Sequence, residues 1–322
     1  MEAGPGRITL WAIEIFVATA DEGSISAAAR RLGASASTVS QQLTNLEAAV
    51  GTSLLRRNAR PLTLTPAGAI FRRRAKAIIA EAELARAEIA RGDLSALTSF
   101  RLGVIEDFEA DVTPGLLTRM SDRLQDCHFQ LETGPSHLLS ERLEERALDV
   151  IVASEVGDPP DWAEVHPLLT EGFVAAAKKG TVDPSADLAR QLRQMPLVQY
   201  TKRHHMGRMI DDHLARHRFR HSQRFELDSY HAILALVAQG AGWTILTPLA
   251  LQRARRFAPE LDVFCLPIPP LSRTISLMAR QDTLGALPVE VAGHLRDLLR
   301  GVIIEPATAQ RPWLHDVLTL LE

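Results

Sequence analysis

The chain has 322 residues, of which 46% are hydrophobic, and this length predicts two or three domains that can each bury a core. The formal net charge of -3 at pH 7 excludes a uniformly basic protein. Two cysteines in so long a chain exclude a disulfide framework and a cysteine-rich metal site.

The first expected elements are three helices. Apolar residues at helical spacing, among them Phe16, predict a helix over residues 9–22. Ser24 can cap a second helix that Gly33 ends, and Ser35 can cap a third. Two short helices joined by a tight turn make a helix-turn-helix.

The third helix has two different faces. Val39, Leu43 and Leu46 repeat at helical spacing and predict a buried side. The opposite side offers hydroxyl and amide groups, which bond phosphate oxygens, and glutamine also pairs with adenine in the major groove. An ordinary polar helix surface would have the same pattern. The residues predicted here to contact DNA are Ser35, Ser37, Thr38, Ser40, Gln41, Gln42 and Asn45.

A basic hairpin is expected after this helix. Leu62 and Leu64 alternate with polar neighbours and predict a strand, so the segment forms a wing beside the helix-turn-helix. Residues 56–76 hold seven basic side chains and no acidic one, an excess typical of a surface that neutralises DNA phosphates. A solvated turn is the alternative. The wing residues predicted to reach the DNA backbone or minor groove are Arg56, Arg57 and Arg60.

A long helix is predicted next, with Thr65 as its cap and Pro66 at its first position. Packing on its own domain is one reading, but so small a domain offers little surface, and we predict dimerisation through this helix. Two-fold symmetry in the protein predicts an inverted-repeat operator. The heptad seam comprises Phe71, Ala75, Ile78, Ala82, Ala85 and Ile89.

The periodicity changes after a hinge at residues 92–99. Strands then alternate with helices, which predicts a parallel α/β sheet. Two lobes joined by two crossovers would leave a cleft, where small ligands usually bind. Strands are expected at 99–105, 127–132, 148–153, 172–177, 196–199, 224–227, 243–247 and 273–279, and helices at 113–124, 138–145, 208–217, 230–239 and 288–299.

Other patterns point to no further chemistry. His213 and His217 have a spacing that can hold a metal, but surface histidines are the favoured reading. Cys127 and Cys265 could form a redox switch, although buried apolar thiols are favoured. No local motif marks a catalytic triad or a carboxylate pair, so we expect no enzyme. Glycine and proline break the uncharged run 232–252, and with no secretion signal expected, the prediction is a cytoplasmic protein without a membrane span.

The motifs of residues 8–68 together resemble the LysR-type transcriptional regulators. They include Gly-Ser-Ile-Ser-Ala-Ala-Ala-Arg-Arg-Leu, Ser-Thr-Val-Ser-Gln-Gln-Leu, Gly-Thr-Ser-Leu-Leu-Arg-Arg and Leu-Thr-Pro-Ala-Gly. The resemblance implies a winged helix-turn-helix, a linker helix and a two-lobed, periplasmic-binding-protein-like α/β effector domain, usually in a tetramer. One departure is Ala36-Ser37, where many members have Gln-Pro; it removes a base contact and leaves the operator sequence open.

The resemblance also sets the domain bounds. The DNA-binding domain is expected at residues 1–65, the linker helix at 66–92 and the effector domain at 93–301. Within the effector domain, lobe I is expected at about 98–165 and 267–301, and lobe II at about 166–266. A helical tail without a specific role is expected at 302–322, because Trp313, Val317 and Leu321 repeat at helical spacing.

The effector residues are also implied by the resemblance. Arg203 could pair with a carboxylate. Glu106 and Asp107 stand where many relatives have a small hydroxyl residue, which suggests a ligand with an amine, and hence an amino-acid-like or mixed-charge effector. Capping and surface roles are the alternative for each position. The predicted set is Ile105, Glu106, Asp107, Ser136, His137, Thr201, Arg203, His204, Ser229 and Thr247.

The sequence therefore predicts a LysR-type regulator that binds double-stranded DNA at an inverted repeat. A small-molecule effector would shift the balance between assembly states, and no cofactor or metal is expected. The other expected partners are further copies of the chain, as a dimer and then a tetramer, with RNA polymerase as a candidate. A small-molecule binding protein with a vestigial DNA-binding head is the alternative.

Overall fold

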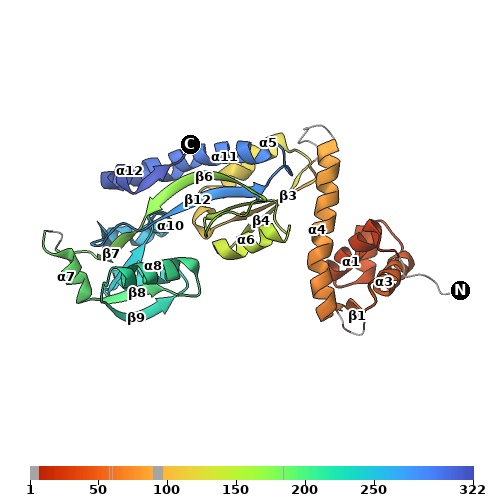
Figure 1. Cartoon of the computed structure of the whole chain (residues 1–322), viewed down its shortest axis with the longest axis horizontal. Coiled ribbons are helices and arrows are strands. Elements are labelled where there is room, and N and C mark those ends of the chain that lie inside the picture. The colour runs from red at the N-terminus through yellow and green to blue at the C-terminus, as the bar shows by residue number, and fades with distance from the viewer. Residues whose placement is uncertain (1–6, 58, 60, 90–96, 184) are drawn as a thin grey trace. The chain divides into compact units, whose positions relative to one another are not determined.

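The computed structural model describes residues 7–57, 59, 61–89, 97–183 and 185–322 (Figure 1). It divides into two compact units, residues 1–99 with 141–149 and residues 100–140 with 150–322. Among the described residues, none of the helices combines the length and the hydrophobicity that a membrane span requires.

The three predicted N-terminal helices are confirmed as α1 (Leu10–Glu22), α2 (Ile25–Arg31) and α3 (Ala36–Val50). Ser24 Oγ accepts from the Ala27 amide at 3.4 Å and Ser35 Oγ from the Thr38 amide at 3.0 Å, so both serines cap as predicted. Gly33 adopts a φ of 63°, a left-handed conformation that favours glycine and allows the turn between α2 and α3.

The wing is a short hairpin of β1 (Leu55–Arg56) and β2 (Thr63–Leu64), in which Leu55 pairs with Leu64. Glu47 on α3 holds its first strand, because Glu47 Oε1 accepts from the amides of Leu54 and Leu55 at 2.8 and 3.1 Å. The hairpin is therefore fixed to the third helix.

The linker helix α4 (Pro66–Ile89) begins where predicted, with Thr65 Oγ1 accepting from the Gly68 amide at 2.9 Å. The heptad seam is only partly available to a second copy, because Phe71 and Ala75 pack into the core of their own domain. Phe71 lies edge-on to Phe16, with ring centroids 5.2 Å apart. Apolar residues at this spacing form a stripe along α4 that can pack against a second copy or against α1, and in the structure α1 covers part of it.

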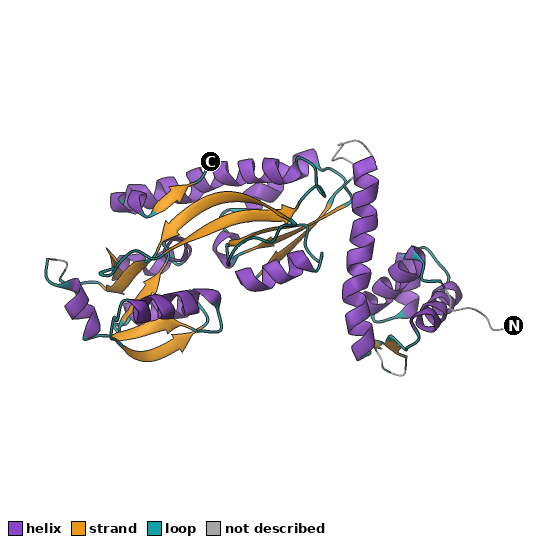
Figure 2. Cartoon of the chain, viewed as in Figure 1, coloured by secondary structure: helices purple, strands orange, loops and turns teal. Residues whose placement is uncertain are grey.

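The first sheet of the effector part contains six strands in the order β13-β6-β12-β5-β3-β4. Only part of it is parallel: β3 runs parallel to β5, whereas β12 is antiparallel to both β5 and β6. The helices α5 and α11 lie on one face and α6 on the other (Figure 2). The strands are β3 (Ser99–Val104), β4 (His128–Thr133), β5 (Val150–Ser154), β6 (Ala163–Gly172), β12 (Ser272–Arg280) and β13 (Leu318–Leu320), and the helices are α5 (Thr113–Arg123), α6 (Ser136–Glu144) and α11 (Leu287–Leu298).

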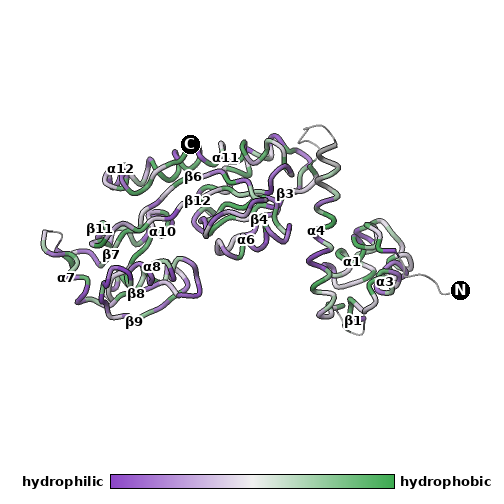
Figure 3. The backbone as a smooth tube through the Cα atoms, in the orientation of Figure 1, coloured by the Kyte–Doolittle hydropathy of each residue, from purple (hydrophilic) through white to green (hydrophobic). Residues whose placement is uncertain are grey.

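The second sheet contains five strands in the order β11-β7-β10-β8-β9, again with antiparallel pairs at β7. The inner strand β7 is mostly hydrophobic, whereas the edge strand β9 is mostly hydrophilic (Figure 3). The two-lobed α/β fold is thus confirmed, with mixed rather than parallel sheets. The elements are β7 (Val174–Lys178), α7 (Leu188–Arg193), β8 (Pro196–Tyr200), α8 (His205–Arg216), β9 (Ser222–Leu227), α9 (Tyr230–Ala238), β10 (Trp243–Leu246), α10 (Pro248–Arg253) and β11 (Leu261–Cys265).

The lobe boundary differs from the prediction. Residues 166–172 belong to the first sheet, because β6 pairs with β12 along its whole length. Pro167 hides this strand in the sequence, since proline removes a ladder hydrogen bond. In the structure Pro167 lies beside a register shift opposite Ile275 and Ser276, where the ladder is already interrupted.

The predicted helical tail is wrong at its end. The chain continues from α11 through η4 (Leu299–Ile304), α12 (Glu305–Gln310) and η5 (Pro312–Asp316), and then forms the strand β13. Pro312 breaks the helix, and Leu318 is buried while Thr319 is exposed, as in a half-buried strand. The Leu321 amide donates to the Leu168 carbonyl at 2.8 Å, which continues the pairing with β6.

Candidate functional site

The predicted DNA-contacting residues share the outward face of α3. Val39, Leu43 and Leu46 are buried in the core, as predicted. On the other side Ser35, Ser37, Thr38, Gln41 and Asn45 are exposed, and Ser40 and Gln42 are half-buried.

Hydrogen bonds order these side chains on the surface of α3. Ser35 Oγ lies 2.8 Å from both Ser37 Oγ and Thr38 Oγ1, and Gln41 Nε2 donates to Asn45 Oδ1 at 2.9 Å. The face therefore presents a fixed arrangement of donors and acceptors without an acidic side chain before Glu47.

The wing arginines differ from one another. The Arg56 side chain on β1 is exposed, and no hydrogen bond or ion pair joins it to the described residues. Arg57 instead donates to Glu47 Oε2 at 2.8 Å and to Thr44 Oγ1 at 3.2 Å, which ties it to α3. Arg60 lies outside the described residues.

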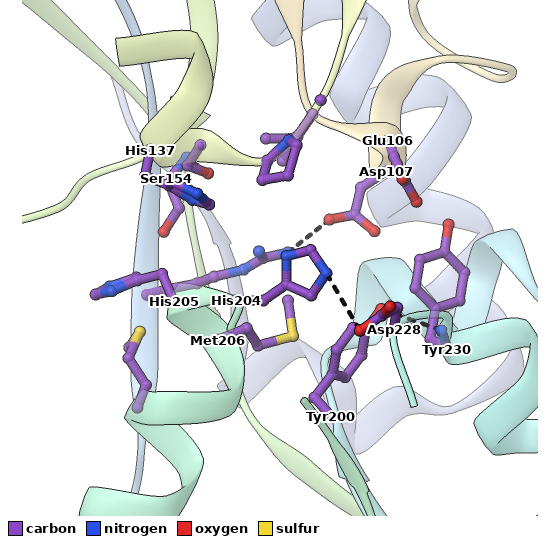
Figure 4. Close-up of a pocket in the computed structure, with 16 residues that line it drawn as sticks. Glu106, Asp107, His137, Ser154, Tyr200, His204, His205, Met206, Asp228 and Tyr230 are labelled. Carbon is purple, nitrogen blue, oxygen red and sulfur yellow. Dashed lines mark hydrogen bonds and ion pairs between the residues drawn. The ribbon is translucent and has the colours of Figure 1, made fainter. Parts of the chain in front are cut away.

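A cavity of about 100 Å³ lies between the two lobes of the effector part (Figure 4). Six predicted effector residues line it: Ile105, Glu106, Asp107, Ser136, His137 and His204. The other lining residues are Gly134, Pro135, Ser154, Tyr200, His205, Met206, Met209, Asp228, Tyr230 and Arg273.

Four predicted effector residues lie elsewhere. Thr201, Arg203 and Ser229 line a separate, open depression, and Arg203 donates to Asp228 Oδ2 at 2.7 Å. Thr247 is buried and caps α10 by accepting from the Ala250 amide at 3.3 Å. Arg203 is therefore outside the cavity lining and is already paired with a protein carboxylate.

Arg273 is the site residue that sequence analysis missed. Its guanidinium is buried at the start of β12 and donates to Asp107 Oδ2 at 2.7 Å and to Glu171 Oε1 at 2.7 Å. Glu171 is fully buried near the end of β6. No clear signal marked this pair, because β6 also contains Glu164 and β12 also contains Arg280, and the sequence does not show which charged residues are buried.

Burial is the main cause of the pKa shifts among the residues that line the cavity. It raises the pKa of Tyr200 and of Tyr230, and the nearby Asp107 carboxylate raises both pKa values further. Burial also lowers the pKa of His205, with Arg208 and His137 adding to the effect. Burial raises the pKa of Glu171, and Arg273 opposes this. The two tyrosines and His205 are therefore uncharged at neutral pH.

Three buried polar atoms of the cavity lining have no hydrogen-bond partner among the described residues: Ser154 Oγ, His137 Nδ1 and Tyr230 Oη. Ser154 and Tyr230 are each only 3% exposed. Leaving buried polar groups unpaired costs free energy, so their presence in one cavity indicates a polar ligand.

The alternative sites raised by the sequence take other roles. His213 Nε2 donates to the Pro269 carbonyl oxygen at 2.8 Å, and its ring contacts that of His217. The prediction that both thiols are buried is wrong, because Cys127 is half-buried before β4 and Cys265 is exposed on β11. Neither cysteine lines the cavity.

Two family models match the chain. Residues 10–69 match the bacterial regulatory helix-turn-helix protein, lysR family, and residues 96–300 match the LysR substrate binding domain.

Two similar relatives are probable hydrogen peroxide-inducible genes activators. The one from Mycobacterium avium is 33% identical over 53% of this chain and 55% of the relative, and the one from Mycobacterium leprae is 34% identical over 61% and 63%. The chain thus spans about half to two thirds of these two relatives.

A longer alignment joins the chain to a probable nitrogen assimilation transcriptional activator of Synechococcus elongatus, 26% identical over 87% of this chain and 91% of the relative. Among solved structures, a full-length OxyR variant from Pseudomonas aeruginosa has a TM-score of 0.66 at 21% identity and covers 93% of this chain and 97% of its own. The LysR family transcriptional regulator CbnR has a TM-score of 0.58 at 19% identity and covers 90% and 99%. These structures share the fold, and the two family models together show that the chain belongs to the LysR family of bacterial regulatory helix-turn-helix proteins.

Proposed function

We propose that this protein regulates transcription by binding DNA through α3 and the wing, under the control of a small molecule in the interlobe cavity. One observation carries the proposal. A helix-turn-helix with an ordered, acid-free face and a cavity lined by both lobes of an α/β domain occur in one chain. DNA recognition and effector binding are thus assigned to separate parts of the molecule.

The proposed assembly is a dimer that forms a tetramer. In support, α4 exposes Ile70 and Ile78, the latter 45% exposed, and α1 exposes Trp11. These side chains offer apolar area that a second copy could cover. The dimer would bind an inverted repeat in the cytoplasm, with RNA polymerase as a further partner. The family is one of regulators, so we propose no enzymatic activity.

Effector binding would act by population shift. The cavity draws its lining from both lobes, so a ligand there favours the lobe separation that it fits best. The effect on DNA binding is limited to the difference between the ligand's affinities for the two states.

Peroxide is a second candidate signal, suggested by the names of the mycobacterial relatives. Thiolate oxidation is the usual route by which a protein senses peroxide. Cys127 and Cys265 lie outside the cavity, the first before β4 and the second on β11. This placement favours a bound effector over a thiol in the cavity.

The test is selection of bound sequences from random duplex DNA by the full chain at two salt concentrations. The proposal expects an interrupted palindrome whose enrichment falls as salt rises. Gln42→Ala should relax discrimination at one base step, whereas Glu109→Gln, in the effector part, should select the same sequence. A chain that binds a small molecule and selects no sequence would instead be a binding protein with a vestigial head.

A further inference from the structure

The interlobe cavity has an acidic end. Glu106 and Asp107 lie at the start of η2 (Glu106–Phe108), directly after β3. Figure 4 shows the Tyr230 hydroxyl pointing toward these two carboxylates. All three side chains belong to the lining, and the Tyr230 hydroxyl is without a hydrogen-bond partner among the described residues.

The positive charge at this end is already matched. Arg273 Nη2 lies 2.7 Å from Asp107 Oδ2 and 2.6 Å from Glu171 Oε1, so two carboxylates face one guanidinium. Even with Glu171 protonated, Arg273 and Asp107 balance and Glu106 leaves an excess negative charge. A ligand carboxylate would have to displace Asp107 from Arg273 beside Glu106, at a cost in desolvation and repulsion.

The other basic residue expected to meet a carboxylate is also engaged. Arg203 is paired with Asp228 at 2.7 Å, and its side chain is 78% exposed. It lines the separate depression, so it offers no cation to the cavity. The mixed-charge effector predicted from the sequence would therefore not find Arg203 in the cavity to bind its anionic group.

The acidic end has the acceptors that an ammonium group needs. An alkylammonium ion has three N–H donors and no acceptor. Glu106 supplies a carboxylate, and Asp107 uses only Oδ2 for Arg273, so Oδ1 stays free of hydrogen bonds from the described residues. Tyr230 Oη supplies the third acceptor. Charge-assisted bonds of this kind are about twice as strong as neutral ones.

The rest of the cavity suits an uncharged remainder. Ile105, Pro135, Met206 and Met209 give apolar walls, and Ser154 Oγ and His137 Nδ1 remain available for one polar group. We propose that the effector is a small organic ammonium compound whose charged nitrogen lies between Glu106, Asp107 and Tyr230. The inference rests on the proposed function, because it names what the sensing cavity binds.

The test uses two matched sets of probes: butylamine, butanol and butyrate, and benzylamine, benzyl alcohol and benzoate. Calorimetry with the full chain should show, in at least one set, the amine binding about ten- to hundredfold more tightly than its alcohol and carboxylate. An equal or better affinity for the alcohol or carboxylate in both sets, or no binding of either amine, would overturn the proposal.

Variants connect the preference to the site. Glu106→Gln removes an exposed charge without touching Arg273, and should weaken amine binding up to about fivefold. Asp107→Asn should abolish the preference, and its circular dichroism spectrum must match the wild type, since a variant that unfolds gives no binding for another reason. Asp122→Asn removes a carboxylate charge in the same way from the exposed surface of α5, outside the lining, and should bind the amine as the wild type does. An amine preference that is undiminished in Glu106→Gln and that also survives in a folded Asp107→Asn would contradict the assignment.

The DNA selection experiment is independent of these measurements. Selection of a palindrome together with no amine preference would reject the ammonium effector and leave the proposed regulator standing. Amine binding without any selected sequence would do the reverse.

Discussion

Arg273 and Glu171 face each other directly on the paired strands β12 and β6, and their ion pair of 2.6 Å is shut off from solvent. The other Glu171 oxygen accepts from the Leu249 amide at 3.0 Å, at the start of α10 in the second lobe. Arg273 also reaches Asp107 in the cavity wall. One buried cluster thus joins the strands β6 and β12, the second lobe and the ligand cavity.

Arg273→Ala should destabilise the effector part by about 3–5 kcal/mol, because it leaves two buried carboxylates without their cation. Urea unfolding measures the loss. The control is Arg123→Ala, whose partner Glu290 lies 2.8 Å away at the surface, and which should cost less than about 1 kcal/mol. Losses of similar size in the two variants would mean that the buried cluster contributes no more than a surface pair.

The stability of the effector part should fall with acid through His213. Burial lowers the pKa of His213, His217 and Arg216 lower it further, and the bond to Pro269 only partly opposes them. A lowered pKa means that the unfolded chain takes up the proton more readily. The contribution is therefore present above the ordinary pKa of 6.5 and is lost as the pH falls below it.

Melting temperatures at about pH 7.5 and about pH 5 test this expectation. His213→Gln should flatten the acid dependence, because glutamine can still donate to the Pro269 carbonyl but takes up no proton. His128→Gln, on the exposed start of β4, should leave the wild-type slope unchanged. A slope identical in the wild type and His213→Gln would assign the acid sensitivity to other groups.

The two described wing arginines should behave differently in DNA binding. Arg56→Ala removes an exposed cation, so affinity for all sequences should fall and the log–log salt slope should become shallower by about 0.9 for one lost phosphate contact. Arg57→Ala should instead loosen the wing, because Arg57 is bonded to Glu47 and Thr44. Fluorescence anisotropy at several salt concentrations separates the two, and a shallower slope for Arg57→Ala alone would reverse the assignment.

Gly207 should be intolerant of a side chain. A Cβ at this position of α8 would lie 2.1 Å from the Thr201 carbonyl oxygen, so Gly207→Ala must push the helix start away from the cavity floor. We expect a loss of about 1–3 kcal/mol and weaker ligand binding. Gly293 in α11 has nothing within 4 Å of such a Cβ, so Gly293→Ala should stabilise by up to about 1 kcal/mol. Equal effects in urea unfolding would contradict the steric argument.

Local signals made the N-terminal part readable from sequence. Ser24 and Ser35 each bond an amide three residues away, and Gly33 provides the turn, so spacing alone predicts the helix-turn-helix. Effector residues such as Asp107 and Ser136 were instead named through the family resemblance, and both line the cavity. Short-range chemistry was sufficient for the helix-turn-helix alone.

Contacts between residues far apart in the chain could not be predicted from the sequence. Arg273 and Glu171 are 102 positions apart, and no periodicity connects them. Arg203 looked like an anion ligand because nothing in the sequence shows that Asp228, 25 positions away, engages it. Pro167 concealed β6 in the sequence. The helical spacing of Trp313 and Val317 concealed the terminal strand, because pairing with the neighbouring strand β6 decides whether this segment forms a strand or a helix.

That terminal strand has a consequence for handling the molecule. β13 covers the outer side of β6, and Arg296 holds the chain end by donating to the Leu321 carbonyl at 2.8 Å. A chain shortened to residue 300, where the family model stops, would leave the amides and carbonyls of residues 168–172 as an open sheet edge. Open edges recruit strands from other molecules. Residues 318–321 therefore close this edge of the sheet, and we expect a chain without them to aggregate more readily.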